Sequence, residues 1–425
     1  SDNITKNFLK AQQRLKSWRE IKPGRQPEYT KVINIDLGKV VPMVAKPHSP
    51  DNVVTVRSLA GKKIDQVCIG SCTNGSYKDM MTAARILKGK KINNNVSLVV
   101  APGSRQVAAM LAQNGAMADM INAGARIMEN TCGFCIGNGQ APSTNGISLR
   151  TNNRNFKGRS GTQSGKIYLV SPQVAALSAL TGKFKDPLQG GKIAVPRISE
   201  PSAFLIDDNM IIKPASPKAK TTIYRGPNIG DPPRNKALPS GLSGRVMLKA
   251  GDKITTDHIM PAGSKLKYRS NVPEYAKYVF EQLNPAFAEQ CLQNKKNNIM
   301  NFIIAGYSYG QGSSREHAAL CPMYLGVKAV IAKSLERIHT ANLINFGIVP
   351  LVFADKGDYK RLKKGDQLAF PDIKRQLKHN EKITVLNKSG NFQIKLDYAL
   401  TPRQKNIIFS GGLLNYTKKI NRSKK

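Results

Sequence analysis

The stretch that decides the fold is residues 65–89, "DQVCIGSCTNGSYKDMMTAARILKG". Its first part, "DQVCIGSC", has the length and apolar content of a buried strand that ends in a loop, and "YKDMMTAARILKG" has the pattern of a helix. The chain continues with the strand "VSLVVAPG", the helical stretch "RQVAAMLAQNGAMADMINAG", the strand "IYLVSP" and the helix "QVAALSALTG". Alternating strands and helices predict an α/β domain with a parallel sheet, which binds ligands at loops that follow its strands.

A second α/β unit is predicted further along the chain. The strands "NFIIAG", "KAVIAKS" and "IVPLVF" alternate with the helices "REHAALCPMYLG" and "LERIHTANLINFG". The stretch between the two units is rich in Pro, Gly and Lys, which is typical of a linker. We therefore expect a basic extension at 1–30, a first α/β domain at 31–195, a linker at 196–241, a second domain at 242–415 and a disordered basic tail at 416–425.

The charge of the chain is its most unusual property. It has 66 Lys and Arg residues against 27 Asp and Glu residues, a formal net charge of +39. Such an imbalance attracts polyanions, of which nucleic acid is the commonest, although a solvated basic surface without a partner is the simpler alternative. No apolar run reaches the roughly 18 residues of a membrane span, so no membrane partner is expected.

The cysteines carry the most specific signal. Cys132 and Cys135 lie two residues apart in "NTCGFCIGNGQAP", and such a pair alone fits a redox dithiol, half of a zinc site, part of an iron–sulfur ligand set, or no site at all. Cys72 stands in "CIGSCTNGS", and "RTNNRNFKGRSGT" follows the pair. Together with "ITTDHIMPAG", "YGQGSSREHAA" and "ERIHTANLINFGIVPL", these motifs resemble the aconitase family of iron–sulfur hydro-lyases from about residue 32 to 415.

The resemblance implies both the architecture and a site. It implies an aconitase-like α/β/α domain with a parallel sheet, followed by the family's mobile, swivel-type C-terminal α/β domain. It also implies that three thiolates hold a [4Fe–4S] cluster whose fourth iron binds substrate oxygen as a Lewis acid. The implied cluster ligands are Cys72, Cys132 and Cys135. The implied substrate contacts are Arg154, Arg159, Arg269, Ser314 and Arg315, and the implied catalytic residues are Ser313, as base, and Asp257.

The family's first two domains normally precede the segment matching "GKVVPMVAKPHSPDNVVTVRSLAG", where a basic segment of some thirty residues stands here. Those domains carry the family's catalytic His–Asp pairs, and acid–base catalysis needs such partners within hydrogen-bond reach. We therefore expect Ser313 and Asp257 to be vestigial and the chain to be inactive. The first functional prediction is a truncated aconitase-like protein recruited as an RNA-binding structural component of the mitochondrial ribosome, in the matrix. Ribosomal RNA and neighbouring ribosomal proteins would be its partners, with a cluster retained, altered or absent.

Two alternatives stay open. The chain is one subunit of a split aconitate hydratase, which isomerises citrate and isocitrate by dehydration and rehydration, and another chain supplies the N-terminal domains. The intact cysteines and arginines favour this alternative, whereas the charge requires a strongly acidic partner to explain it. The other alternative is regulatory binding of messenger-RNA hairpins in the absence of a cluster, which in the family uses all of the domains.

Overall fold

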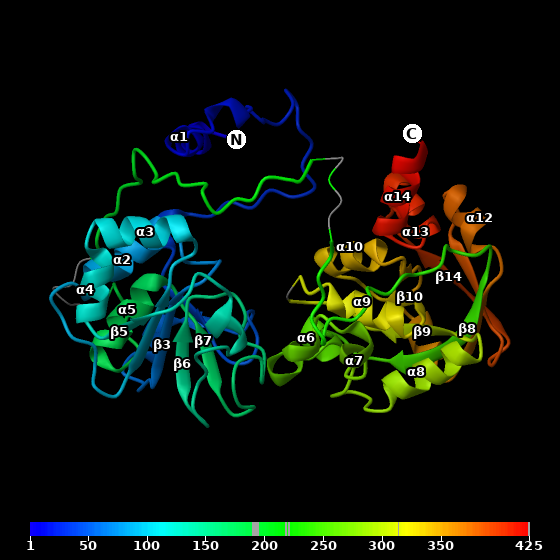
Figure 1. The fold of residues 1–425 in the computed structure, drawn as a ribbon. Helices are drawn as coiled ribbons and strands as arrows, with labels where there is room; N and C mark the ends of the chain where they lie inside the picture. Colours follow the sequence, from blue (N-terminus) through cyan, green and yellow to red (C-terminus); the bar gives the residue numbers. More distant parts are fainter. Residues whose placement is uncertain (189–194, 217–218, 220–221, 313, 424–425) are drawn as a thin grey trace. The chain divides into compact units, whose positions relative to one another are not determined.

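The computed structural model describes residues 1–188, 195–216, 219, 222–312 and 314–423 (Figure 1). They fall into two compact units, residues 1–220 and 221–425, which are described separately below. Both units combine helices with sheets that contain parallel strands, so the predicted α/β class is confirmed. Within these described ranges, every helix is too short or too polar to cross a bilayer.

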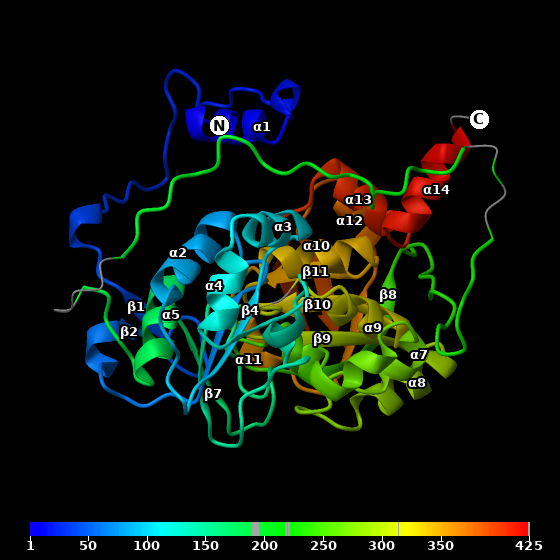
Figure 2. The same cartoon turned by 60° about the vertical axis from the view of Figure 1, so that its left-hand side comes forward.

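Unit 1 is built on a seven-stranded sheet with the order β2-β1-β7-β6-β3-β4-β5 (Figures 1 and 2). Its parallel strands are β3 (Gln66–Gly70), β4 (Ser97–Ala101), β5 (Ala125–Ile127), β6 (Ile147–Arg150) and β7 (Lys166–Leu169), and β1 (Met43–Ala45) and β2 (Val53–Thr55) form an antiparallel edge. The chain runs from β3 through β4 to β5 on one side and from β6 to β7 on the other. The loop after β3 therefore lies at the switch point of the sheet, where α/β folds bind ligands.

One face of this sheet is covered by helices. Helices α2 (Tyr77–Leu87) and α5 (Pro172–Thr181) pack on each other and on β3, and a capping box between Ser76 and Asp79 begins α2. The predicted helical stretch at 105–124 is two helices, α3 (Arg105–Gln113) and α4 (Ala116–Asn122). The break lies at Gly115, whose φ of 79° is left-handed and ends the helical path.

The opposite face of the sheet lies under the paired cysteines. Successive residues of a strand face opposite sides, so Cys68 and Val99 point away from the helices. They form a small buried cluster with Phe134, the residue between Cys132 and Cys135. The turn that carries the cysteine pair is therefore part of the packing of the sheet.

Unit 2 contains a closed barrel of seven strands in the order β10-β11-β14-β13-β12-β8-β9. The strands are β8 (Leu242–Lys249), β9 (Met300–Ala305), β10 (Val327–Ala332), β11 (Val349–Phe353), β12 (Gln367–Phe370), β13 (Ile383–Asn387) and β14 (Phe392–Asp397). Strands β8 to β11 are mutually parallel and the remaining pairings are antiparallel. The three strands predicted for this unit are β9, β10 and β11, so the strands that close the barrel were missed.

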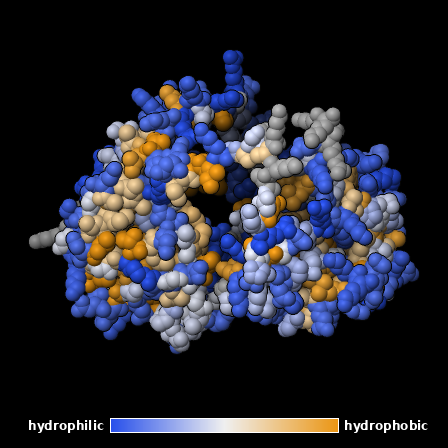
Figure 3. All heavy atoms as spheres, in the orientation of Figure 1, coloured by the Kyte–Doolittle hydropathy of each residue, from blue (hydrophilic) through white to orange (hydrophobic). Residues whose placement is uncertain are grey.

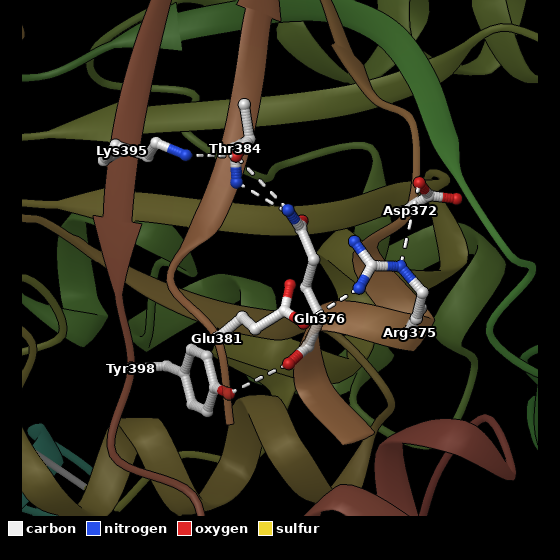
Figure 4. Close-up of polar contacts among 7 residues, drawn as sticks. All are labelled: Asp372, Arg375, Gln376, Glu381, Thr384, Lys395 and Tyr398. Atoms are coloured by element: carbon white, nitrogen blue, oxygen red, sulfur yellow. Dashed lines mark hydrogen bonds and ion pairs between the residues drawn. The ribbon is translucent and has the colours of Figure 1, made fainter. Parts of the chain in front are cut away.

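Helices surround the barrel and extend to the end of the described chain. They are α6 (Thr256–Ile259), α7 (Val272–Ala276), α8 (Phe287–Lys296), α9 (His317–Tyr324), α10 (Arg337–Asn345), α11 (Asp358–Arg361), α12 (Ile373–Lys378), α13 (Pro402–Phe409) and α14 (Leu413–Ser423). The basic tail, expected to be disordered, is helical as far as Ser423. Figure 4 shows how Gln376 of α12 binds the barrel: its side chain exchanges hydrogen bonds of 3.2 and 3.3 Å with Thr384 of β13.

The N-terminal segment packs within unit 1. Helix α1 (Asn3–Ala11) places the Phe8 ring 5.4 Å from the ring of Phe204, and the Trp18 ring lies 4.8 Å from the Lys6 ammonium. In the view of Figure 3, hydrophilic residues cover most of the surface, with separate hydrophobic patches among them. Because 66 basic residues face 27 acidic ones, at least 39 basic side chains have no one-to-one acidic partner in the chain.

Candidate functional site

The first cysteine loop follows β3 at the switch point of the sheet. Ser71 has a φ of 69°, which is uncommon for a residue with a side chain, and its N–H donates to the Ala101 carbonyl at 2.8 Å. A Cβ atom on Gly75 would lie 2.3 Å from the Ser71 carbonyl oxygen, so only glycine fits there. The loop that carries Cys72 is thus tightly folded against the end of β4.

The second cysteine loop is a short 3₁₀ turn, Gly133–Ile136. Cys132 begins the turn, and the Cys135 N–H donates to the Cys132 carbonyl at 2.9 Å. Between them, the Phe134 ring is buried against the sheet, and its carbonyl accepts hydrogen bonds from Arg150 and from the Ser160 hydroxyl. The turn is therefore fixed from below by both packing and hydrogen bonds.

The structure brings the three predicted cysteines together. All three are free thiols, with Cys72 and Cys132 exposed and Cys135 buried. Partial burial raises the pKa of the Cys132 thiol, and the proximity of Cys72 and Cys135 raises it further, so this thiol faces both of the others. The Arg159 guanidinium donates to Cys135 Sγ at 3.6 Å.

The chemistry of this thiol set fits a polynuclear cluster. In the part of the chain that the structure describes, no three His, Cys, Asp or Glu side chains are spaced for a single metal ion. In an iron–sulfur cluster each thiolate binds a different iron, and three thiols supply ligands for three of the irons. A buried guanidinium beside Cys135 also suits thiolates, which carry negative charge.

Arg154 and Arg159 lie on the loop that follows β6, at the same edge of the sheet as Cys72. Arg159 is buried and reaches Cys135, whereas Arg154 is half-buried and its guanidinium donates to the Asn153 side chain at 2.7 Å. Of the two predicted substrate arginines of unit 1, the structure therefore links Arg159 directly to the cysteines.

In unit 2 the structure pairs two of the predicted residues. The Arg315 guanidinium donates to the Asp257 carboxylate at 2.9 Å and also to the Met260 carbonyl, and both charged side chains are largely buried. Asp257 lies in α6, and Arg315 precedes α9. A carboxylate and a carbonyl thus hold one guanidinium in a fixed orientation, as recognition of a substrate carboxylate requires.

The remaining predicted residues of unit 2 are Arg269, Ser313 and Ser314. The Arg269 side chain is exposed, and its backbone carbonyl lies 2.8 Å from Nε2 of His317 in α9. Ser314 is exposed next to Arg315, whereas Ser313 lies outside the described residues. The structure therefore gives positions for every predicted site residue except Ser313.

Sequence reasoning missed two buried supports of these loops. Arg150 is fully buried beneath the cysteine turn, and no motif in the sequence marks it. His339 of α10 is 1% exposed and lies under Gly310, the first glycine of "YGQGSS". Neither of its ring nitrogens has a hydrogen-bond partner in the described part of the chain.

His339 should make the stability of unit 2 depend on pH. Burial lowers the pKa of His339 from 6.5 to about 4. The unfolded chain binds this proton more tightly, so the contribution of His339 is complete above pH 6.5 and is lost as the pH falls from 6.5 to 4. We expect a loss of up to about 3 kcal/mol across this window.

Urea unfolding at pH 7.5 and pH 4.5 measures this loss, and His339→Phe is the matched variant because it keeps the edge-to-face contact with Tyr309 at 5.3 Å. The phenylalanine variant should lose less stability on acidification than the unmodified protein. Equal losses in the two proteins would assign the effect to other groups.

Comparisons with known proteins agree with the site. The model of the aconitase family (aconitate hydratase) matches residues 57–182, and that of the aconitase C-terminal domain matches residues 247–356. A putative mitochondrial aconitate hydratase of Aspergillus fumigatus is 31% identical over 91% of this chain and 56% of its own length. The mitochondrial homocitrate dehydratase of Saccharomyces cerevisiae is 28% identical over 95% of this chain and 59% of its own. The 3-isopropylmalate dehydratase large subunit 2 of Archaeoglobus fulgidus is 41% identical over 44% of this chain and 45% of its own.

These relatives overturn the first functional prediction. All three are named as hydratases or dehydratases, so the interpretation as an inactive, RNA-binding ribosomal component with ribosomal RNA and ribosomal proteins as partners is wrong. The error came from the net charge, which governs solubility and attraction of polyanions but does not identify a fold or an activity. The mitochondrial names of two relatives agree with the expected location.

The extent of the match is also informative. The chain spans about half the length of the curated relatives that it matches, and the two family models fall one in each compact unit. The matched regions contain the three cysteines and the Asp257–Arg315 pair. The chain belongs to the aconitase family.

Proposed function

We propose that this chain is the cluster-binding and C-terminal part of a mitochondrial iron–sulfur hydro-lyase, which interconverts citrate and isocitrate by dehydration and rehydration. The observation that carries the proposal is the convergence of three free thiols, with the Arg159 guanidinium beside one of them, at the switch point of a parallel sheet. A site with thiols only for packing would have no reason to place a buried cation against a sulfur.

Cys72, Cys132 and Cys135 would hold three irons of a [4Fe–4S] cluster, which supplies a Lewis-acidic iron without a protein ligand for the substrate hydroxyl. The protein contributes the cations around it. Arg159 and Arg154 stand at the same sheet edge as the thiols, where a substrate carboxylate would accept their hydrogen bonds.

Unit 2 carries the other residues that the proposal assigns to the substrate. Arg315, already oriented by Asp257, presents a charged fork, and Arg269 is exposed and free to reorient towards a second carboxylate group. We assign Ser313 as the base that removes the proton from the carbon next to the leaving hydroxyl, with Ser314 contacting the substrate. A serine hydroxyl acts as a base only where neighbouring cations stabilise its alkoxide, and arginines serve that purpose.

The proposal includes a partner chain. One relative is named a large subunit, so division between chains occurs in a protein that this chain resembles. The net charge of +39 favours a partner with an acidic surface, because such a surface is attracted over long range and neutralises the unpaired basic side chains.

The native complex, purified from mitochondria and reconstituted with iron and sulfide without oxygen, tests the proposal. We expect interconversion of citrate and isocitrate, with homocitrate and 3-isopropylmalate tested in parallel as substrates of the relatives. Turnover of homocitrate or 3-isopropylmalate alone would change the substrate that we assign. Absence of turnover with every associated chain present would contradict the hydro-lyase function.

A further inference from the structure

Arg150 is the largest side chain that the fold buries completely. It stands at the end of β6, and all of its hydrogen bonds go to uncharged oxygens. Nε donates to the Ser148 hydroxyl at 3.0 Å, and one terminal nitrogen donates to the Gln66 side-chain oxygen at 3.0 Å. The other terminal nitrogen donates to the Ser160 hydroxyl at 2.6 Å and to the Phe134 carbonyl.

The strand register places this group directly under the cysteine turn. Cys68 of β3 pairs with Arg150 of β6, and Gln66 pairs with Ser148. These four residues therefore face the same side of the sheet, which is the side covered by Phe134. The guanidinium carbon lies 5.9 Å from the centre of the Phe134 ring. The guanidinium also donates a hydrogen bond to the carbonyl of Phe134, the residue that immediately precedes Cys135.

Burying this charge is costly without a counter-charge. Among the described residues, no Asp or Glu oxygen lies within 4 Å of Arg150. Hydrogen bonds to neutral oxygens engage all three guanidinium nitrogens but leave the positive charge uncompensated, and a buried unpaired charge destabilises a fold. A fold that retains such a group beneath a set of thiols is suited to an anionic occupant of those thiols.

We propose that Arg150 is an electrostatic positioning residue for the anionic iron–sulfur group on Cys72, Cys132 and Cys135, an inference that rests on the proposed function. Three thiolates outnumber the positive charge of an oxidised [4Fe–4S] core, so the bound group is an anion and each added electron makes it more negative. The buried guanidinium stabilises this negative charge by an interaction that water does not screen, and it stabilises the reduced form most.

Two variants separate the charge from the hydrogen bonds. Arg150→Gln and Arg150→Lys both lose the five-donor fork, but only the glutamine variant loses the charge. The measurement is the potential for one-electron reduction of the cluster in the reconstituted chain, followed by electron paramagnetic resonance. We expect the glutamine variant to be at least tenfold harder to reduce, which corresponds to 59 mV, and the lysine variant to stay close to the unmodified protein.

The matched control is Arg126→Gln. Arg126 is exposed, and its guanidinium donates to the Gly139 carbonyl and the Gln140 side chain of the same cysteine-bearing segment. Its loss removes hydrogen bonds at a hydrated site, so the potential should not move. A second readout is the rate of iron release to a chelator, which should rise about tenfold in Arg150→Gln and less in Arg150→Lys.

The possible failures can be told apart. If the unmodified chain takes up no cluster, the proposed function fails and the inference fails with it. If the unmodified chain is loaded but Arg150→Gln keeps the same potential, or the lysine variant shifts as far as the glutamine variant, Arg150 only ties the turn to the sheet and the inference alone is overturned. Circular dichroism and thermal unfolding of the unloaded variants establish that each one is folded before the comparison.

Discussion

Replacing Cys135 with serine is expected to abolish binding of the proposed cluster and to lower the rate of the proposed citrate–isocitrate interconversion at least about 100-fold. Loss of a partner that merely orients a metal ligand costs 10- to 100-fold, and loss of the ligand itself costs more. A serine hydroxyl is a harder and less acidic ligand than a thiol, and iron–sulfur clusters select thiolates. Iron and sulfide content, visible absorbance and the coupled isomerisation assay measure the two effects.

Cys135 is the most informative of the three positions. It is the one buried cysteine of the set, and the Arg159 guanidinium donates to its sulfur at 3.6 Å. Water or a buffer thiol therefore has little access to take the place of the lost ligand. The same substitution at Cys72 or Cys132 exchanges an exposed side chain. We therefore expect the least residual cluster in Cys135→Ser.

Cys68→Ala is the control for this prediction. Cys68 is fully buried in β3, four residues before Cys72, and belongs to the small buried cluster that contains Phe134. Its truncation should cost about 1 kcal/mol in packing and leave the cluster in place. Equal loss of iron from both variants would mean that the effect is one of folding, and normal loading of Cys135→Ser would remove Cys135 from the ligand set.

The parts of the fold that were predicted are those with a local signal. Strands β3, β4, β9, β10 and β11 are short apolar runs that end in loops, and their period and length identify them. Strands β12, β13 and β14 close the barrel by antiparallel pairing, and their sequences mix polar and apolar residues. Pairing of this kind depends on contacts between distant segments, which no local window contains.

The site divides in the same way. Motif resemblance singled out Cys72, Cys132 and Cys135, and the proximity of Cys132 to the other two agrees with a common site. Arg150 has no motif, because an arginine at the end of a strand has the appearance of a surface residue until the register with Cys68 and the contact with Phe134 are known. Burial of a charge is a tertiary property, and the sequence shows the charge without the burial.

The second large effect is expected at Gly310. Its φ of 86° is left-handed, and a Cβ atom there would lie 2.3 Å from Cγ and Cδ2 of His339 and 2.4 Å from its Cβ. His339 is 1% exposed, and the Gly310 N–H donates a 2.7 Å hydrogen bond to the Ile254 carbonyl. Adding the cost of the left-handed backbone, about 1–2 kcal/mol, to that of overpacking, about 1–3 kcal/mol, we expect Gly310→Ala to destabilise unit 2 by roughly 3 kcal/mol.

The substitution should also affect binding, because the displaced backbone leads directly to Arg315. Urea unfolding measures the loss of stability, and the substrate concentration that gives half-maximal rate measures the displacement.

Gly251→Ala is the matched control: a Cβ there meets no atom within 4 Å, and its effect should stay within about 0.5 kcal/mol. His339→Ala should not rescue Gly310→Ala, because the alanine keeps the Cβ atom at 2.4 Å. A Gly310→Ala variant as stable as Gly251→Ala would show that the loop can move away from α10, and the predicted loss of stability would then be wrong.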